Sequence, residues 1–268
     1  MTVDLTGRYA VVTGAATGIG RGLAREAARR GAKVLVVDVD DPGESVALVE
    51  SDGGRAAGVV CDITDADALQ ALAAEHSDVD LVCANVGIGM AGTILTLEPA
   101  DFRRILEVNV VGTVATVQAF LPGLRAARSV GRPASILITG SEHSLGVPPY
   151  VAPLSAYTTS KHALLGLAAC MRRDLEDEGI DVTLLCPGYV RTERLQARAN
   201  ESAAVAEVVK RYAQEVDEVA RLAFDGLAAG QLVVPTNPVS TAFVTELHTA
   251  IVDAMPSDAH LSRCTPQG

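Results

Sequence analysis

The sequence contains no tryptophan and only five cysteines among 268 residues. The cysteines are odd in number and form no Cys-x-x-Cys pair, which argues against a disulfide framework and against a zinc site. Four of them lie in or beside apolar stretches, so we expect thiols of the protein core in a reducing cytosol and no metal site. The five are Cys61, Cys83, Cys170, Cys186 and Cys264.

Positive charge is also scarce. The chain has 22 Lys and Arg against 33 Asp and Glu, a net charge of −11, which argues against a nucleic-acid-binding surface. The longest apolar runs are too short, or too interrupted by charge and glycine, for a membrane span. The first residues lack the basic and apolar regions of a signal peptide. We therefore expect a cytoplasmic protein whose partners are neither nucleic acid nor membrane.

Apolar runs and helical patterns alternate along the chain. Runs suited to buried strands cover residues 8–13, 33–37, 56–60, 79–84, 134–139, 181–185 and 232–234. Helical patterns cover residues 23–30, 44–50, 65–76, 99–128 and 155–178. With no linker and no internal repeat, this order predicts one α/β domain over residues 1–268, a doubly wound Rossmann-type parallel sheet of about seven strands with helices on both faces.

A glycine-rich turn follows the first strand, with Gly14, Gly18 and Gly20 spaced as GxxxGxG. Glycines let the backbone approach a pyrophosphate at a helix N-terminus, where free N–H groups and the helix dipole favour anions. Asp38 ends the second strand, where a carboxylate would accept hydrogen bonds from the adenosine ribose. The full order of strand, turn, helix, strand and acid predicts a dinucleotide site. The alternative is a flexible connecting loop.

Tyr157 and Lys161 lie four residues apart in a predicted helix, so they share one helix face. An ammonium group beside a phenol favours the phenolate and lowers its pKa from about 10. Such a tyrosine could take a proton from an alcohol or give one to a ketone. The alternative is an ordinary pair on a helix surface.

The polar features collect where predicted strands end. In a doubly wound sheet, ligands bind beyond the carboxyl ends of the strands. Each feature follows a strand directly, which predicts a binding site at that edge of the sheet. The features are residues 14–20, Asp38, Asp62, Asn85, Ser141 and the pair Pro187 and Gly188.

Taken together, these motifs resemble those of the short-chain dehydrogenase/reductase family, in its compact single-domain branch. The resemblance covers residues 5–192 and, loosely, 232–234. It implies an oxidoreductase that transfers a hydride between a nicotinamide cofactor and a secondary alcohol or ketone, in a homodimer or homotetramer. The matching motifs are Thr13-Gly14-xxx-Gly18-Ile19-Gly20, Asp62, Asn85-x-Gly87, Asn109, Ser141, Tyr157-xxx-Lys161 and Pro187-Gly188.

The resemblance implies the catalytic roles. Tyr157 is the general acid or base, and Lys161 lowers its pKa and holds the nicotinamide ribose. Ser141 hydrogen-bonds the reacting oxygen, with Ser144 as its rival because the segment from Ser141 to Tyr157 is longer than is common in the family. Asn109 resembles the residue that holds a water beside Lys161, and the alternative for it is a satisfied polar residue in a buried helix.

The resemblance also implies the cofactor contacts. Asp62 and Ile63 would meet adenine, Asn85 would position the strands around the cofactor, and Val190 and Thr192 would meet the nicotinamide carboxamide. The other expected contacts are Gly14, Thr17, Gly18, Ile19, Gly20, Asp38, Gly87, Tyr157, Lys161, Pro187 and Gly188. Because Asp38 would repel a 2′-phosphate and no basic residue follows it, we predict NAD as the cofactor.

The segment 193–230 has a helical, partly apolar pattern and is expected to cover the substrate, either as a mobile lid or as an amphipathic helix pair on the surface. Residues 236–268 form a C-terminal extension. An apolar cover suits a hydrophobic small-molecule alcohol or ketone. Glu142 and His143 are expected to be solvated loop residues, with the mouth of the substrate site as the alternative.

Other functions compete with this interpretation. A sugar-nucleotide epimerase or dehydratase shares the Tyr-xxx-Lys pair but needs a larger C-terminal domain. A non-catalytic nucleotide-binding relative would be expected to lose Ser141, Tyr157 or Lys161, and a methyltransferase would not need Tyr157 and Lys161. The long helices at 100–128 and 155–178 carry more apolar residues than one packed face requires, which predicts a dimer or tetramer.

Overall fold

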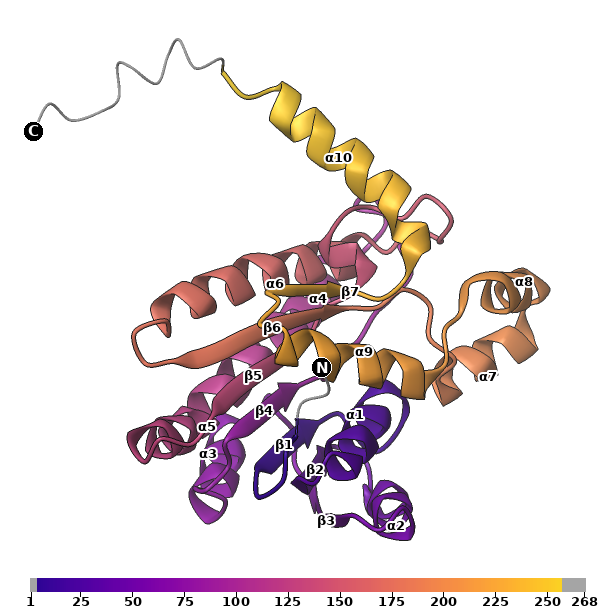
Figure 1. Cartoon of the computed structure of the whole chain (residues 1–268). Coiled ribbons are helices and arrows are strands. Elements are labelled where there is room, and N and C mark those ends of the chain that lie inside the picture. The colour runs from indigo at the N-terminus through magenta and orange to yellow at the C-terminus, as the bar shows by residue number, and fades with distance from the viewer. Residues whose placement is uncertain (1–3, 257–268) are drawn as a thin grey trace, which may run out of the picture.

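One parallel sheet of seven strands forms the centre of the structure, a computed structural model that describes residues 4–256 (Figure 1). The strand order is β3-β2-β1-β4-β5-β6-β7, so the direction of winding reverses between β1 and β4. This confirms the predicted Rossmann-type sheet. The strands are β1 Tyr9–Thr13, β2 Lys33–Asp38, β3 Arg55–Val60, β4 Leu81–Ala84, β5 Ala134–Thr139, β6 Ile180–Cys186 and β7 Val233–Pro235.

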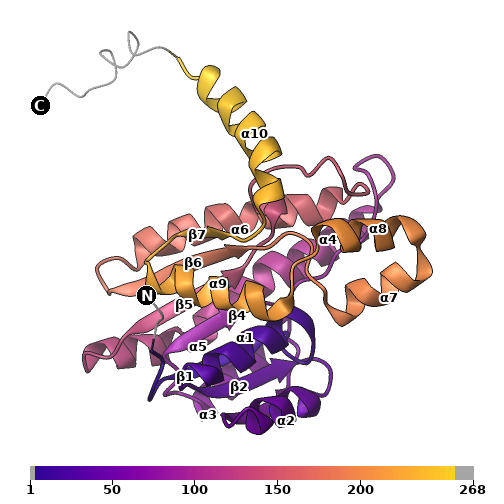
Figure 2. The same cartoon turned by 45° about the vertical axis from the view of Figure 1, so that its right-hand side comes forward.

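Helices cover both faces of the sheet, as Figures 1 and 2 show. Helices α1 and α9 pack together on one face, and α3, α5 and α6 lie on the other. The helices are α1 Gly18–Arg29, α2 Gly43–Ser51, α3 Ala66–Glu75, α4 Pro99–Leu106, α5 Gly112–Ser129, α6 Ser155–Asp174, α7 Glu193–Glu201, α8 Ala203–Tyr212, α9 Val216–Ala228 and α10 Thr241–Asp253.

The central strands are apolar throughout because both of their faces are buried. In β2, Val34 and Val36 join the core beneath α1 and α9, whereas Leu35 and Val37 join the core beneath α3 and α5. Successive side chains of a strand point to opposite faces, so a continuous apolar run fills two cores at once. This packing holds the carboxyl ends of the strands at one edge of the sheet.

The helix predicted over 99–128 is continuous, but its centre is a π-helical segment, Glu107–Val111, with Asn109 in the middle. Gly112 follows this segment, and its backbone lies close to the Ile63 side chain, because a Cβ on Gly112 would lie 2.6 Å from Ile63 Cδ1. By length and composition alone, the 31-residue helix Pro99–Ser129 could cross a membrane, which the sequence interpretation had not recognised. Half of its most apolar window is buried inside the fold.

Two helix bounds differ from the prediction. Helix α1 begins at Gly18, five residues before the predicted Leu23, because the glycine-rich turn itself forms the first helical turn. Helix α6 ends at Asp174, before the predicted residue 178. The chain turns there because Gly179 adopts a φ of +66° and Ile180 N–H donates to Leu175 O over 3.3 Å.

The segment 193–230 divides into parts with different surroundings. Helix α9 belongs to the core, where Val219 and Phe224 are fully buried against the sheet and α1. Helices α7 and α8 pack on each other as a hairpin beside the carboxyl edge of the sheet (Figure 2). Helix α10 extends away from the body and exposes Ile251 and Val252. The rest of the expected extension, from residue 257, lies outside the described residues.

The cysteines follow the expectation of core thiols only in part. Cys61, Cys83 and Cys186 are free and buried, but Cys170 is exposed on α6, because it lies on the helix face turned away from the sheet. Cys264 lies outside the described residues. Within residues 4–256, no group of three or more His, Cys, Asp or Glu side chains has a metal-binding arrangement.

Candidate active site

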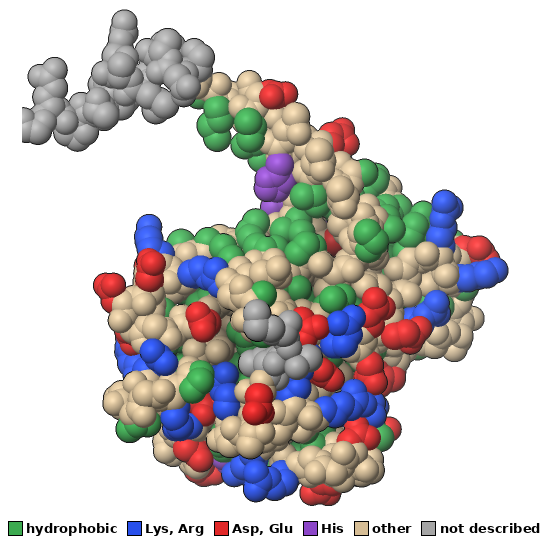
Figure 3. Space-filling view, in the orientation of Figure 1, with side chains coloured by type: hydrophobic (Ala, Val, Ile, Leu, Met, Phe, Trp, Pro, Cys, Tyr) green, Lys and Arg blue, Asp and Glu red, His purple; other side chains and the backbone are tan. Residues whose placement is uncertain are grey.

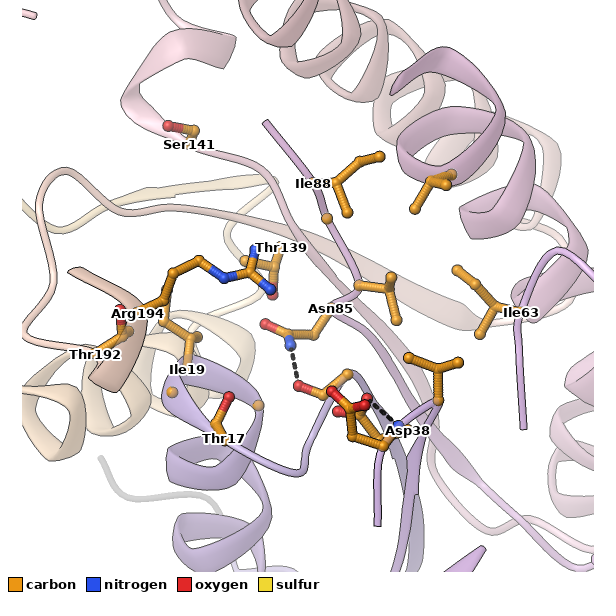
Figure 4. A pocket seen from close by; sticks show the side chains of 18 of the residues that line it. Thr17, Ile19, Asp38, Ile63, Asn85, Ile88, Thr139, Ser141, Thr192 and Arg194 are labelled. Atoms are coloured by element: carbon orange, nitrogen blue, oxygen red, sulfur yellow. Dashed lines mark hydrogen bonds between the residues drawn. The ribbon is translucent and has the colours of Figure 1, made fainter. Parts of the chain in front are cut away.

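A cleft of about 370 Å³ opens at the carboxyl edge of the sheet, at the point where the strand order reverses (Figure 4). Ligands of doubly wound sheets bind at this position. The structure brings together here nearly all the residues that the sequence assigned to the cofactor. They are Gly14, Thr17, Gly18, Ile19, Gly20, Asp38, Asp62, Ile63, Asn85, Gly87, Tyr157, Lys161, Pro187, Gly188 and Thr192.

The glycine-rich turn requires glycine on steric grounds. Gly18 adopts a φ of +57°, and a Cβ on Gly20 would lie 2.1 Å from Gly14 O. Helix α1 therefore starts directly against the end of β1, with its N-terminus facing the cleft. The Gly18 N–H donates to Glu193 Oε2 over 2.9 Å, so a carboxylate lies at the helix start, where the dipole favours negative charge.

The Asp38 carboxylate faces the cleft from the end of β2 (Figure 4). Its Oδ2 accepts the Ala16 N–H at 2.8 Å and its Oδ1 accepts the Asp40 N–H at 3.1 Å. These bonds fix the carboxylate against the glycine-rich turn and leave it further lone pairs for a ligand's hydroxyl groups. Val39 and Asp40 also line this part of the cleft, so a second carboxylate lies close to Asp38 in the sequence and in the cleft wall.

Asn85 joins the ends of the two central strands. Its Nδ2 donates to Thr13 O and to Gly14 O, each at 3.1 Å, and its backbone N–H donates to Thr13 Oγ1 at 3.1 Å. Val86 follows it, and a Cβ on Gly14 would lie 3.1 Å from Val86 Cγ2. The end of β4 therefore holds the glycine-rich turn in place.

Tyr157 lies in the first turn of α6, and Lys161 lies one turn further on the same face. The Lys161 Nζ is 5.6 Å from the centre of the Tyr157 ring and donates to Thr139 O over 2.8 Å. Ser141 follows β5 and lines the same space. The structure thus places a phenol, an amine and a hydroxyl around one point of the cleft.

Burial dominates the electrostatics of this group. It lowers the pKa of Lys161, which is 2% exposed, to about 8. Burial also raises the pKa of the Tyr157 phenol, with the Ser141 hydroxyl acting in the opposite direction. The sequence predicted a lowered phenol pKa from the neighbouring ammonium. The direction differs because the desolvation of the phenolate, together with the charges of Glu142 and Cys186, outweighs the hydrogen bond with Ser141.

Ser141 is a better candidate than Ser144 for contact with a substrate. Ser141 Oγ accepts the His143 N–H at 3.2 Å and lines the cleft. Ser144 is fully buried, and its Oγ accepts the Ser141 N–H at 3.2 Å. The two serines form a capping box, in which Ser144 holds the backbone of Ser141.

Asn109 lines neither the cleft nor the cavity beside it. Its Oδ1 accepts the Ile88 N–H at 2.8 Å, and its Nδ2 donates to Ile88 O and to Ser160 Oγ, each at 2.9 Å. The side chain is thus satisfied inside the fold, as the alternative describes, and its role in holding a water beside Lys161 stays a prediction. Through these bonds, the π-helical segment fixes the loop that follows β4.

A second cavity, of about 460 Å³, adjoins the first and shares Ser141 and Tyr157 with it. Its walls are mostly apolar, and Val190, expected at the cofactor, lies here instead of in the first cleft. Helix α7 closes one side with Leu195, Arg194 and Arg198. The apolar part of the wall is Ile88, Ala91, Val151, Ala152, Leu154, Val190 and Leu195.

The sequence predicted that Glu142 and His143 are solvated loop residues, and this is wrong. They are 2% and 5% exposed and line the second cavity. Glu142 Oε2 accepts bonds from Tyr150 OH at 2.6 Å and from Ser240 Oγ at 2.7 Å. Burial raises the pKa of Glu142. The prediction failed because Ser240 lies 98 positions away in the chain, which no local pattern indicates.

His143 lies edge-on to the Tyr157 ring, with 5.2 Å between ring centres. Its Nδ1 is 2.8 Å from Thr158 Oγ1. Burial and the charges of His162 and Lys161 lower the pKa of His143 to about 4, so the ring is neutral at physiological pH. His143 therefore supports the Tyr157 ring without adding charge to the site.

The cleft fits a nicotinamide dinucleotide. Thr139 Oγ1 is buried and finds no hydrogen-bond partner within residues 4–256, although it borders the cleft. A buried hydroxyl in that state costs roughly 1–3 kcal/mol, and a polar ligand group would satisfy it. The start of α1 favours a pyrophosphate, Asp38 suits a ribose, and Lys161 and Tyr157 lie at the far end. The sequence interpretation missed Thr139 because its hydroxyl matches no motif.

Comparisons with known proteins agree with this geometry. A family model described as short chain dehydrogenase matches residues 8–217. The 1-deoxy-11-beta-hydroxypentalenate dehydrogenase of Streptomyces exfoliatus is 38% identical over 202 residues, which cover 72% of this chain and 71% of that protein.

Solved structures extend the likeness to almost the whole chain. A short-chain dehydrogenase/reductase from Burkholderia phymatum in complex with NAD gives a TM-score of 0.82 at 28% identity, and covers 96% of this chain and 98% of its own. An NAD(P)-dependent dehydrogenase from Beutenbergia cavernae with bound NADP gives a TM-score of 0.78 at 28% identity, and covers 89% of this chain and 98% of its own. Neighbours of this fold therefore bind either nicotinamide cofactor.

Proposed function

The chain belongs to the short-chain dehydrogenase family, and from this we propose that it transfers a hydride between a nicotinamide cofactor and a secondary alcohol or ketone, with Tyr157 as general acid or base. One observation carries the assignment of the site. Ser141 and Tyr157 line both the cleft that fits the cofactor and the apolar cavity beside it, so a carbon held between them can face both.

Each side chain has a defined task. Tyr157 takes the hydroxyl proton when an alcohol is oxidised and returns it when a ketone is reduced. Ser141 donates a hydrogen bond to the reacting oxygen and orients it. Lys161 supplies positive charge next to the phenol and a donor to a ribose. A nicotinamide cofactor held in the cleft would supply the hydride chemistry.

A screen of hydrophobic secondary alcohols and ketones tests this function. Apolar walls exclude water and favour such substrates. We expect oxidation of at least one alcohol with NAD, or reduction of the matching ketone, measured by the absorbance of the reduced cofactor. A protein that binds the cofactor but turns over no member of a broad panel in either direction would contradict the proposal.

We further propose NAD as the preferred cofactor. The support is Asp38, with Asp40 beside it, because two carboxylates would repel a 2′-phosphate. We expect NAD to bind at least about tenfold more tightly than NADP, and Asp38→Ala combined with Val39→Arg to move the preference toward NADP.

Titration of both cofactors by fluorescence measures this preference. Asp40→Ala is the matched control, because it removes one carboxylate from the same part of the cleft but leaves Asp38 in place, and it should change the ratio less. Equal affinities of the native protein for the two cofactors would refute the assignment.

A homo-oligomer, a dimer or tetramer built on α5 and α6, is also proposed. Figure 3 shows hydrophobic side chains gathered over α6 below α10. Helix α6 exposes Ala163, Gly166 and Cys170. Val111, which directly precedes α5, is 49% exposed. We expect light scattering at micromolar concentration to give at least twice the mass of the 27.8 kDa chain. A monomer would count against this arrangement.

The chain is proposed to act as a single domain in the cytoplasm, on a small molecule rather than on nucleic acid or at a membrane. The support is its acidic charge balance, the cysteines Cys61, Cys83, Cys170 and Cys186 in the free form, and a single sheet that runs from β1 to β7. Fractionation of cells that produce the protein would test the location.

A further inference from the structure

Helix α7 brings two arginines to the second cavity. Arg194 and Arg198 are one helical turn apart and share one face of α7. Arg194 lines both cavities, and its side chain extends over the cleft toward Thr139 (Figure 4). Arg198 lines the second cavity only. The two guanidinium groups therefore have different surroundings, and only Arg198 belongs to the substrate side alone.

Neither arginine has a carboxylate partner within residues 4–256, whereas other arginines of this region do. Arg191 pairs with Glu215 at 2.8 Å, and Arg21 pairs with Glu193 at 3.0 Å. Both side chains are exposed, and Arg103 and Arg104 also form no ion pair within residues 4–256, so the position of Arg194 and Arg198 beside the second cavity is what distinguishes them. An arginine kept free of protein carboxylates can bind an external one.

Neither acidic residue of α7 forms an ion pair with Arg198. Glu193, at the start of α7, is engaged with Arg21 and with the Gly18 N–H. Glu201 lies three residues after Arg198, but no ion pair within 4.0 Å joins them. The second cavity thus keeps a positive charge on its α7 side.

Glu142 is the one carboxylate that lines the second cavity within the described residues. Its Oε2 already accepts the Tyr150 and Ser240 hydroxyls. Tyr189 also lines the cavity, and burial raises the pKa of its phenol. The charge of Arg198 is close enough to lower that pKa in part. The positive charge of Arg198 is therefore felt inside the cavity, and the carboxylate of Glu142 is held by other groups.

The cavity has three chemically distinct zones. Ser141 and Tyr157 form the reactive end, apolar side chains form much of the wall, and Arg198 lies on the α7 side. A guanidinium group matches a carboxylate in shape and donates two parallel hydrogen bonds to it. An uncharged substrate would use the first two zones and leave the third without a function.

We propose that the substrate of this enzyme carries a carboxylate at the far end of an apolar body, and that Arg198 binds this carboxylate while the alcohol or ketone carbon lies at Tyr157. The inference rests on the proposed oxidoreductase function and names its substrate class. Arg198 is then a specificity-determining residue, because it touches the substrate away from the reacting atoms.

Matched pairs of compounds test the proposal. The probes are 4-oxocyclohexanecarboxylate and 4-(4-oxocyclohexyl)benzoate, each compared with its methyl ester, in the presence of the reduced cofactor. A charge-assisted hydrogen bond is worth about 10- to 100-fold in affinity, so we expect kcat/KM for at least one acid to exceed that of its ester by about this factor, mostly through KM.

Variants locate the effect. Arg198→Gln should abolish the preference for the acid and leave kcat/KM for the ester within about twofold, whereas Arg198→Lys should retain part of the preference because it keeps the charge. Arg55→Gln is the matched control. Arg55 is exposed, has no ion-pair partner in the described chain and lies at the opposite edge of the sheet, at the start of β3.

The possible outcomes are separable. Equal kcat/KM for acids and esters in the native enzyme, or an equal loss for both in Arg198→Gln, would overturn the proposal and leave the oxidoreductase function intact. If no compound is turned over, the proposed function loses support, and calorimetric titration of the same acids and esters into the protein with its cofactor still measures the preference. Equal dissociation constants there would also overturn the carboxylate proposal.

Discussion

Tyr157→Phe is expected to reduce turnover by at least about 10²–10⁴-fold, which is the usual contribution of a general acid or base. The substitution removes only the phenolic oxygen. Without it, the hydroxyl proton of the substrate has no acceptor during oxidation, and the developing alkoxide has no donor during reduction. Turnover of an identified substrate, followed by the absorbance of the reduced cofactor, measures the loss.

The packing around the ring makes this substitution a clean test. The Tyr157 ring is held by the edge of His143, at 5.2 Å between ring centres, and by the backbone of Gly89, where a Cβ would lie 3.2 Å from Tyr157 Cδ2. Phenylalanine keeps these contacts, so cofactor affinity and melting temperature should change little. Near-normal turnover by the variant would remove Tyr157 from the mechanism.

Tyr189→Phe is the matched control for Tyr157→Phe. Tyr189 also lines the second cavity, and burial raises the pKa of its phenol as it does for Tyr157. It has no place next to Ser141 and Lys161 in the cofactor cleft. A loss of turnover confined to Tyr157→Phe therefore identifies proton transfer, whereas equal losses would indicate a general effect of polarity in the cavity.

The fold was predictable because its signals are local. Every strand of this sheet is short and apolar enough to be recognised alone, and the order of the strands with their intervening helices specifies a doubly wound sheet. The turn at Gly14–Gly20 and the acid Asp38 lie next to strand ends, so the topology alone brings them to one edge. Motifs that are far apart in the sequence still meet at this edge, because each motif directly follows its own strand.

The features that were missed depend on contacts between distant segments. Glu142 is buried because Ser240, from the segment before α10, closes over it. Arg198 borders the substrate cavity because α7 folds back over the site after β6. No periodicity distinguishes this arginine from one on a solvated helix face. The sequence predicted a solvated loop position for Glu142, with the mouth of the substrate site as the alternative, and made no prediction for Arg198.

The pKa of Tyr157 shows a different limit. The sequence places an ammonium group one turn away, and the sign of that charge predicts a lowered phenol pKa. Burial has the opposite sign and is a property of the folded chain only. The balance between the two depends on how much solvent reaches the ring, which spacing along a helix cannot give.

The second large effect is expected from Lys161→Met, which removes the amine and keeps most of the aliphatic volume. Lys161 is 2% exposed, and its Nζ donates to Thr139 O over 2.8 Å beside the Tyr157 ring. Loss of the charge should reduce turnover by about 10²-fold or more, because the phenolate loses its stabilising cation. Unlike Tyr157→Phe, it should also weaken cofactor binding, measured by fluorescence titration.

Measuring the thermal stability of Lys161→Met distinguishes a loss of turnover through chemistry from one through unfolding. Burial lowers the pKa of Lys161 from 10.5 to about 8, so between these values the unfolded chain binds more protons than the folded one, and Lys161 makes stability rise with pH across that window. Below pH 8, the buried charge lowers the free energy of unfolding by on the order of 3 kcal/mol, which exceeds the roughly 1–2 kcal/mol expected from leaving Thr139 O without its donor.

Lys161→Met should therefore melt no lower than the native protein at pH 7. It should also lack the rise in stability that the native protein shows between pH 8 and 10.5. An inactive variant that melts well below the native protein at pH 7 would show that Lys161 is held for stability, and a variant with normal turnover would show that the site works without its charge.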